Sequence, residues 1–230
     1  MILATCHSAA HCDVTYKPGS GNRPGQITLS GEILTNDIEH FSAFAEMAHK
    51  DGPYVVLLDS SGGDLETALA MGRIIRKHRA IVIVEEVGKC LSSCVFVLAG
   101  GITRAVYGPV GIHRPFDPKD LQTNEKLQRE RYEQLGSEVK SYLETMNIPA
   151  ELYDHMIRIP PQKITYLSRD QLQRYGLSEN DPYADAAMNA SSAKRLGIST
   201  EEFIRRMAKV NTVCGSDDSE CVNRVLREGE

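Results

Sequence analysis

Strand-like and helix-like segments alternate along the first half of the chain. Nearly continuous apolar runs, typical of strands buried on both faces, occupy residues 54–58 and 81–84, and residues 26–33 alternate between apolar and polar positions. Apolar side chains return every three or four residues over residues 36–50 and after Asp64, as on one face of a helix. This order predicts stacked βαβ units and a largely parallel sheet covered by helices.

The second half of the chain has a mainly helical pattern. Residues 121–146 are mostly polar but carry a sparse apolar stripe, which predicts one long helix. A shorter helix is expected over residues 150–157, because the two prolines that come soon after it end a helix. Another helix is expected to begin at Ser168 and to end before Gly176. The chain as a whole therefore belongs to the α/β class.

Turn residues and a change of pattern divide the chain into three parts. Residues 1–25 contain closely spaced prolines and glycines and predict a flexible lead-in. Residues 26–180 hold the strand–helix alternation and are expected to form the main domain. Residues 181–230 are expected to form a helical appendage, because a capping box at residues 199–202 precedes a short apolar stripe.

Composition narrows the classes of partner. The 230 residues are 41% apolar and 25% charged, as in ordinary globular proteins, and the net charge of −5 comes without a dense basic stripe. A nucleic-acid partner is therefore not expected, and no apolar run is long enough to predict a membrane span. No Cys-x2-Cys pair or nucleotide-binding feature is present, so neither a metal nor a cofactor is expected.

The cysteines bear on the cellular compartment. All six fall in close pairs, which are Cys6 with Cys12, Cys90 with Cys94, and Cys214 with Cys221. Local pairing favours disulfides and an exported, for example periplasmic, protein over a cytosolic protein with free thiols. The middle pair fits this interpretation least well, since two cysteines four residues apart in a helix need some distortion to meet disulfide geometry.

Ser92 lies where a strand-like segment gives way to a helix. The apolar run at residues 81–84 is followed by a break at Gly88, two serines and then an apolar segment that predicts a buried helix. A serine on such a turn is exposed, and the N–H groups of the first helical turn lack internal partners and can receive an oxyanion. Serine is also a common helix cap, so this turn alone favours the structural interpretation.

Two other stretches change that interpretation. Residues 55–65 contain a strand followed by a pair of glycines, and residues 110–115 contain a strand that ends at His113. Together with the Ser92 turn they resemble the Clp protease proteolytic subunit and its relatives, the peptidases on the crotonase-type fold. That family has a strand ending in Ser-Pro-Gly-Gly, then Gly-x-x-x-Ser opening a helix, and later a strand ending in His-x-Pro. The likeness covers residues 26–180, and the glycine pair and Ser92 are separated by the same number of residues as in the family.

The resemblance implies a fold, a site and an assembly. The fold would be a Clp protease-like spiral of ββα units with a mainly parallel sheet, in which the long helix is an arm between subunits of a homo-oligomer. The pattern of that helix alone fits equally well a solvated helix that packs against its own domain. Ser92 would be the nucleophile and His113 the base that takes its proton. The backbone N–H groups of Gly63 and Ser93 would form the oxyanion hole. The substrate would be a peptide or an unfolded protein.

The family uses a third catalytic residue, an acid that orients the histidine, and this chain departs from the family at that position. In the family the acid lies two positions before an aromatic-Leu-Ser motif, which is residues 166–168 here, and this chain has Ile164 at that position. Isoleucine cannot orient or stabilise an imidazolium, and loss of the acid can lower the rate by about 10⁴. Three possibilities remain: Asp154 reaches His113 from the preceding helix, Ser92 and His113 act as an unaided dyad, or the chain is not catalytic.

Three functions are compatible with these residues. The Ser–His pair favours a serine peptidase that hydrolyses peptide bonds. The missing acid favours a catalytically silent binding or scaffold protein on the same fold. A crotonase-type acyl-CoA enzyme would use the same two backbone donors on a thioester oxygen, but no adenine or pantetheine site is recognisable in the sequence.

Overall fold

The computed structural model describes residues 13–21, 23–116, 125–214 and 218–229. It divides the chain into two compact units, residues 1–181 and residues 182–230. Within the described ranges, the helices are all too short or too polar to cross a membrane. The predicted pair of Cys6 and Cys12 lies outside the described residues.

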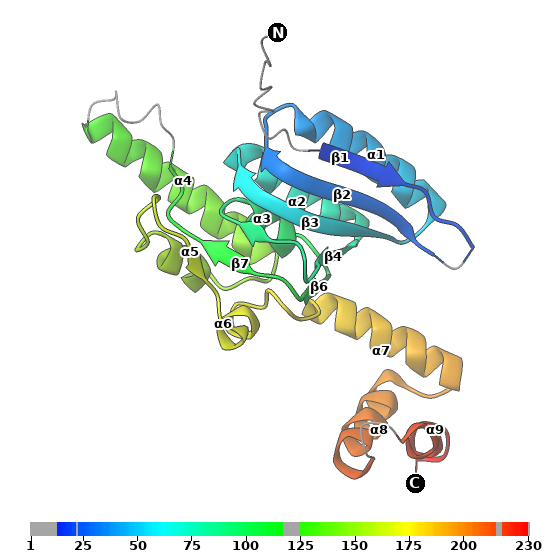
Figure 1. The fold of residues 1–230 in the computed structure, drawn as a ribbon. Helices are drawn as coiled ribbons and strands as arrows, with labels where there is room; N and C mark the ends of the chain where they lie inside the picture. The colour runs from blue at the N-terminus through cyan, green and yellow to red at the C-terminus, as the bar shows by residue number, and fades with distance from the viewer. Residues whose placement is uncertain (1–12, 22, 117–124, 215–217, 230) are drawn as a thin grey trace. The chain divides into compact units, whose positions relative to one another are not determined.

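The first unit is built on a mainly parallel sheet, which has eight strands among the described residues (Figure 1). In chain order they are β1 (Asp13–Lys17), β2 (Gly25–Ile33), β3 (Tyr54–Gly63), β4 (Ile81–Val84), β5 (Cys90–Leu91), β6 (Thr103–Val106), β7 (Val110–Ile112) and β8 (Thr165–Tyr166). Pairing is antiparallel between β1 and β2 and between β7 and β8, and parallel elsewhere. The predicted α/β class with a mainly parallel sheet is therefore confirmed.

Strand β3 is shared by two branches of the sheet. Residues 55–58 of β3 pair with β4, which continues to β6. Further along, Ser60 of β3 pairs with Cys90 of β5, and β5 continues to β7. Because β3, β5 and β7 run parallel in this register, their carboxyl ends lie at one edge, where open parallel sheets bind ligands.

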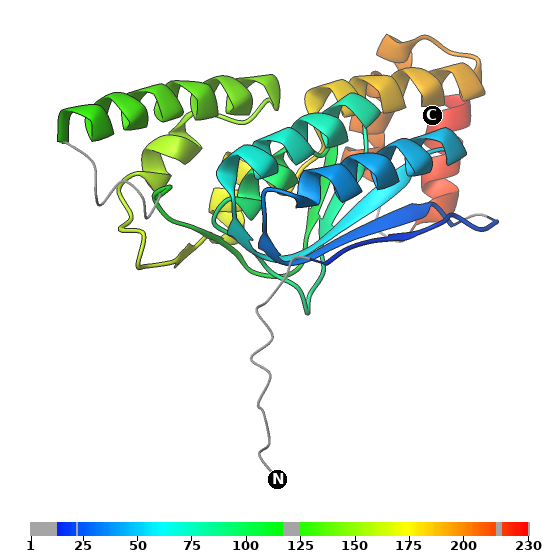
Figure 2. The ribbon, with the colours of Figure 1, turned by 90° about the horizontal axis from the view of Figure 1, so that it is seen from above.

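Helices cover this sheet and contribute buried side chains to the core. Their bounds are α1 (Asp37–Asp51), α2 (Leu65–His78), α3 (Cys94–Ala99), α4 (Glu125–Thr145), α5 (Glu151–Met156) and α6 (Arg169–Arg174). Figure 2 shows α1 and α2 along one face of the sheet. Phe41 of α1 and Leu69 of α2 are fully buried with Val56 of β3, and each such side chain contributes about 1.5–3 kcal/mol of hydrophobic stabilisation. Helix α3 is buried along its whole length, as its continuous apolar sequence predicted.

The start of the first unit differs from the sequence prediction. Residues 13–17, which were expected in a flexible lead-in, form β1 along the edge of β2. Val14 and Tyr16 pack against the core from this strand, and the Tyr16 ring stacks on Phe44. The glycines and prolines that follow make the connection between β1 and β2, which explains why their composition resembled that of an unstructured segment.

The second unit consists of three helices in its described part, α7 (Pro182–Leu196), α8 (Thr200–Val213) and α9 (Ser219–Glu228). The buried cluster between α8 and α9 is small and centres on Val210 and Val225. A disulfide between Cys214 and Cys221 joins the two helices, as predicted. A small core of this kind gains stability from such a cross-link.

Candidate functional site

Ser92 occupies a sharp turn between β5 and α3. It has a φ of 55°, in the left-handed region, which costs a non-glycine residue about 1–2 kcal/mol. Its N–H donates to the carbonyl of Gly111 at 2.8 Å, and the residue is partly exposed. A partly exposed serine on a strained strand-to-helix turn is the arrangement of a nucleophile elbow in hydrolases.

A disulfide closes this turn. Cys90 and Cys94 are bonded, their Cα atoms are 5.3 Å apart, and both residues are fully buried. The sequence suggested that a pair four residues apart in one helix would need distortion. That premise was wrong, because Cys90 belongs to β5 and Cys94 is the first residue of α3. The backbone between them bends instead of continuing as a helix.

The end of β3 packs directly against the Ser92 turn. Gly62 has a φ of 84°, and a Cβ on it would lie 2.5 Å from the Leu91 carbonyl oxygen and 2.7 Å from Ser92 Cβ. Gly63 has a φ of 149°, and a Cβ there would collide with the backbone of Ile33. Only glycine therefore allows this loop to approach the turn so closely.

Ser93 binds the glycine loop to the start of α3. The Gly63 N–H donates to Ser93 Oγ at 2.8 Å, and the same hydroxyl donates to the Gly63 carbonyl at 3.1 Å. Ser93 is 4% exposed. Of the two adjacent serines, Ser92 is thus the accessible one, while Ser93 is occupied in a structural contact. The sequence did not indicate this contact, since it depends on the tertiary approach of the loop.

His113 follows the last residue of β7 and is partly exposed. Its Nδ1 lies 2.9 Å from the carbonyl oxygen of Arg114. Because a carbonyl can only accept, this contact requires a proton on Nδ1, and in the neutral form of such a ring Nε2 can take a proton. Within the described part of the chain, the Ser92 hydroxyl and the His113 ring are not hydrogen-bonded. The partner of Nδ1 is a backbone group, which no pattern of residue types could reveal.

The candidate residues stand at the ends of neighbouring strands. The glycine pair ends β3, Ser92 follows β5, and His113 follows β7, in the order in which these strands pair. Strand β8 runs antiparallel beside β7, with Thr165 opposite Ile112. The same register, extended by one residue, would put Ile164 opposite His113. On this extension, the position that resembles the family's acid is next to the histidine and carries an apolar side chain.

The structure pairs Asp154 with another residue. Its Oδ1 on α5 lies 2.7 Å from the Nζ of Lys140 on α4, and both side chains are nearly half exposed. Among the described residues, neither Asp154 nor another carboxylate is hydrogen-bonded to His113. Ser92, His113 and the glycine pair thus come to one edge of the sheet, and Asp154 does not join them.

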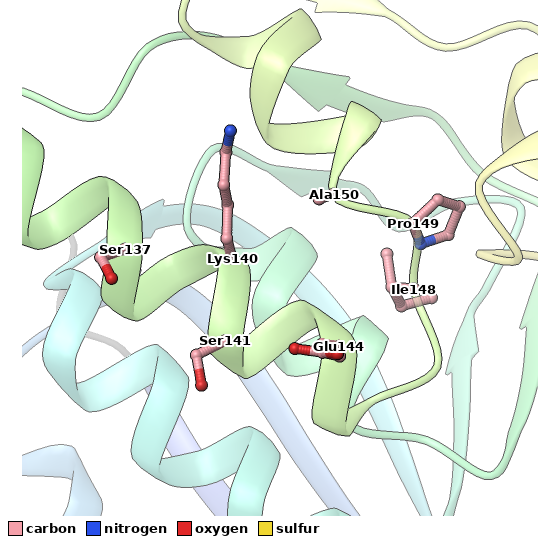
Figure 3. A pocket seen from close by; sticks show the side chains of 7 residues that line it. All are labelled: Ser137, Lys140, Ser141, Glu144, Ile148, Pro149 and Ala150. Carbon is pink, nitrogen blue, oxygen red and sulfur yellow. The ribbon is translucent and has the colours of Figure 1, made fainter.

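A shallow surface depression of about 600 Å³ lies elsewhere, on α4 and its connection to α5 (Figure 3). It is lined by Ser137, Lys140, Ser141, Glu144, Ile148, Pro149 and Ala150. Its lining includes Lys140, whose ammonium group pairs with Asp154. None of the lining residues belongs to the sheet edge that carries Ser92 and His113.

Solved structures provide the comparisons for this fold. A mutant of the 1510-N membrane-bound stomatin-specific protease matches with a TM-score of 0.50 and 16% identity, over 73% of this chain and 82% of that chain. ClpP1 from Listeria monocytogenes matches with a TM-score of 0.47 and 16% identity, over 66% of this chain and 88% of that chain. No protein-family model and no curated protein matches the sequence. At this identity the match to the stomatin-specific protease shows the fold alone, and that fold is the Clp protease-like architecture that the motifs implied.

Proposed function

We propose that this protein is a serine peptidase that hydrolyses peptide bonds in extended or unfolded polypeptides. The observation that carries the proposal is the order of chemically suited groups along one sheet edge, from the glycine pair through Ser92 to His113. The accessibility of Ser92, in contrast to the buried Ser93, supports Ser92 as the nucleophile. The Clp protease-like fold supports the same reaction class.

In the proposed reaction, Ser92 Oγ attacks the carbonyl carbon of the peptide bond while Nε2 of His113 takes the hydroxyl proton. The backbone N–H groups of Ser93 and Gly63 stabilise the negative oxygen of the tetrahedral intermediate. The imidazolium then gives its proton to the leaving amine, and water hydrolyses the Ser92 ester by the same route. For Gly63 to take part, its N–H must turn from the Ser93 hydroxyl to the substrate oxygen.

We expect this peptidase to be slow. The Arg114 carbonyl can fix the tautomer of His113, but it carries no full charge to stabilise the imidazolium. Loss of the orienting acid lowers the rate by about 10⁴ in serine proteases. For Asp154 to replace that acid, its carboxylate would have to leave Lys140, to which it is bonded at 2.7 Å. The proposed working pair is therefore Ser92 and His113 without a carboxylate.

The proposal is tested by hydrolysis of a pool of unstructured fluorogenic peptides. Wild type should show slow turnover that disappears in Ser92→Ala and in His113→Ala, while Ser93→Ala keeps it. Circular dichroism of each variant confirms that the fold is retained. A wild-type rate no higher than that of Ser92→Ala would overturn the peptidase proposal.

A second candidate is a protein that binds polypeptides without cleaving them. The apolar Ile164 at the position opposite His113 favours this function, because the site then lacks a group that stabilises the charged histidine. Wild type and Ser92→Ala should in that case bind an unfolded polypeptide equally, and neither should release fragments. Cleavage by wild type alone would exclude this candidate.

Location and assembly are part of the same proposal. The disulfides Cys90–Cys94 and Cys214–Cys221 support an oxidising compartment such as the periplasm. Alkylation of the freshly isolated native protein followed by mass spectrometry should find these four cysteines protected, and free thiols would argue against export. Assembly into a homo-oligomer through α4 is tested by sedimentation velocity, in which a monomer at micromolar concentration would contradict it.

A further inference from the structure

The disulfide between Cys90 and Cys94 encloses the Ser92 turn. Cys90 is the first residue of β5, and Cys94 is the first residue of α3. Ser92 lies midway between them and has the left-handed φ of 55°. Both cysteines are 0% exposed, so the cross-link lies inside the folded domain.

Without a restraint, this turn has a competing conformation. Right-handed backbone angles at Ser92 would extend α3 towards its N-terminus, and L-residues other than glycine favour those angles. Successive helical residues point about 100° apart, so such an extension would redirect the Ser92 hydroxyl. Hydrogen bonds oppose this change on both sides of Ser92, from its own N–H to the Gly111 carbonyl and between Ser93 and Gly63, but none of them is covalent.

The disulfide excludes that competing conformation by geometry. In a regular helix, the Cβ atoms of residues four apart are about 5–6 Å from each other. A disulfide needs its two Cβ atoms within about 3.5–4.5 Å. The bonded pair therefore cannot span a regular helical turn, and residues 90–94 cannot form one continuous helix.

We propose that the Cys90–Cys94 disulfide is a positioning element for the nucleophile, which keeps Ser92 in the conformation that exposes its hydroxyl at the sheet edge where His113 also lies. This inference rests on the proposed peptidase function. Removal of the disulfide leaves the left-handed conformation of Ser92 disfavoured, and the population of the reactive turn falls about tenfold. Substrate contacts outside the turn stay as they are, so the loss falls on the acylation step and not on binding.

The second unit provides a matched control. Cys214 and Cys221 close a loop of similar length, with a sequence separation of 7 against 4 for the proposed positioning disulfide. Removal of either disulfide relaxes the unfolded chain to a comparable degree. Of these two disulfides, Cys90–Cys94 is the one that encloses a candidate reactive residue.

The test compares Cys90→Ala/Cys94→Ala, Cys214→Ala/Cys221→Ala and wild type, all as the full chain. A fluorophosphonate probe is titrated to separate the maximal labelling rate, kinact, from the apparent affinity, KI, and urea unfolding reports stability. We expect kinact to fall about tenfold in the first variant with KI unchanged, and neither value to change in the second. A merely structural role would lower stability without this split between kinact and KI.

The outcomes separate this inference from the proposed function. Absence of probe labelling in wild type would contradict the peptidase itself. A folded Cys90→Ala/Cys94→Ala variant that labels Ser92 at the wild-type rate would overturn the positioning role and leave the peptidase intact. Should that variant not fold, Cys90→Val/Cys94→Ala retains more apolar volume in the buried site. Failure of both to fold would assign the disulfide to stability and would likewise overturn the inference.

Discussion

Replacement of Ser93 by alanine tests how the oxyanion hole is restrained. In the structure the Gly63 N–H donates to Ser93 Oγ at 2.8 Å, and this bond must break before the N–H can receive an oxyanion. A neutral hydrogen bond of this kind contributes about 1 kcal/mol net. Ser93→Ala removes that cost, so acylation of Ser92 should become about fivefold faster.

The same substitution should lower stability. Ser93 Oγ also donates to the Gly63 carbonyl at 3.1 Å, and the loss of two buried hydrogen bonds costs about 1–3 kcal/mol. Ser60→Ala is the matched control from the same loop. Ser60 Oγ donates to the Gly31 carbonyl at 2.6 Å and accepts from the Gly62 N–H at 3.1 Å, so two bonds are lost without freeing the Gly63 N–H.

The assay is the second-order rate of fluorophosphonate labelling, with urea unfolding measured on the same samples. Ser93→Ala should label faster and unfold more easily, whereas Ser60→Ala should only unfold more easily. A folded Ser93→Ala protein that labels ten times more slowly than wild type would refute the reasoning. It would mean that the hydroxyl assists catalysis instead of competing for the oxyanion donor.

Other substitutions and conditions give distinct outcomes. Ile164→Asp puts a carboxylate opposite His113 at a position that is 38% exposed, and it should raise the labelling rate at least tenfold; no rise would contradict the register argument. Asp154→Asn should change labelling less than twofold, because this carboxylate pairs with Lys140, and a sharp loss would identify it as the missing acid. Burial lowers the pKa of His78 in the folded protein. As the pH falls, the His78 ring therefore takes up a proton in the unfolded chain before it does so in the folded protein, and the free energy of unfolding should fall as the pH drops from 7.5 through about 6.5 to 5.5. Urea unfolding at these pH values checks this, and His78→Gln should flatten the dependence.

The sequence predicted the long elements because burial imposes a pattern on them. The helix expected over residues 36–50 is α1, and the apolar run at residues 81–84 is β4. Strands β5 and β8 have two residues each, which is too short for any periodicity. Their pairing is set by the longer strands beside them, so only the structure could show them.

The candidate site was predictable in type but not in contacts. Residue identity and spacing selected Ser92 and His113, since these chemistries require those side chains near a glycine loop. The partners of Ser93 and Asp154 depend on which segments approach them in three dimensions. The Cys90–Cys94 disulfide was underrated because a four-residue spacing suggests a helix, whereas the backbone bends at Ser92.

The central claim is that Ser92 is a nucleophile activated by His113. Its most direct test is a fluorophosphonate reaction with the native full chain, followed by digestion and mass spectrometry of the modified peptide. We predict a single adduct on Ser92 that is absent in Ser92→Ala and strongly reduced in His113→Ala. No adduct on wild type, or an adduct that persists in Ser92→Ala, would contradict the account.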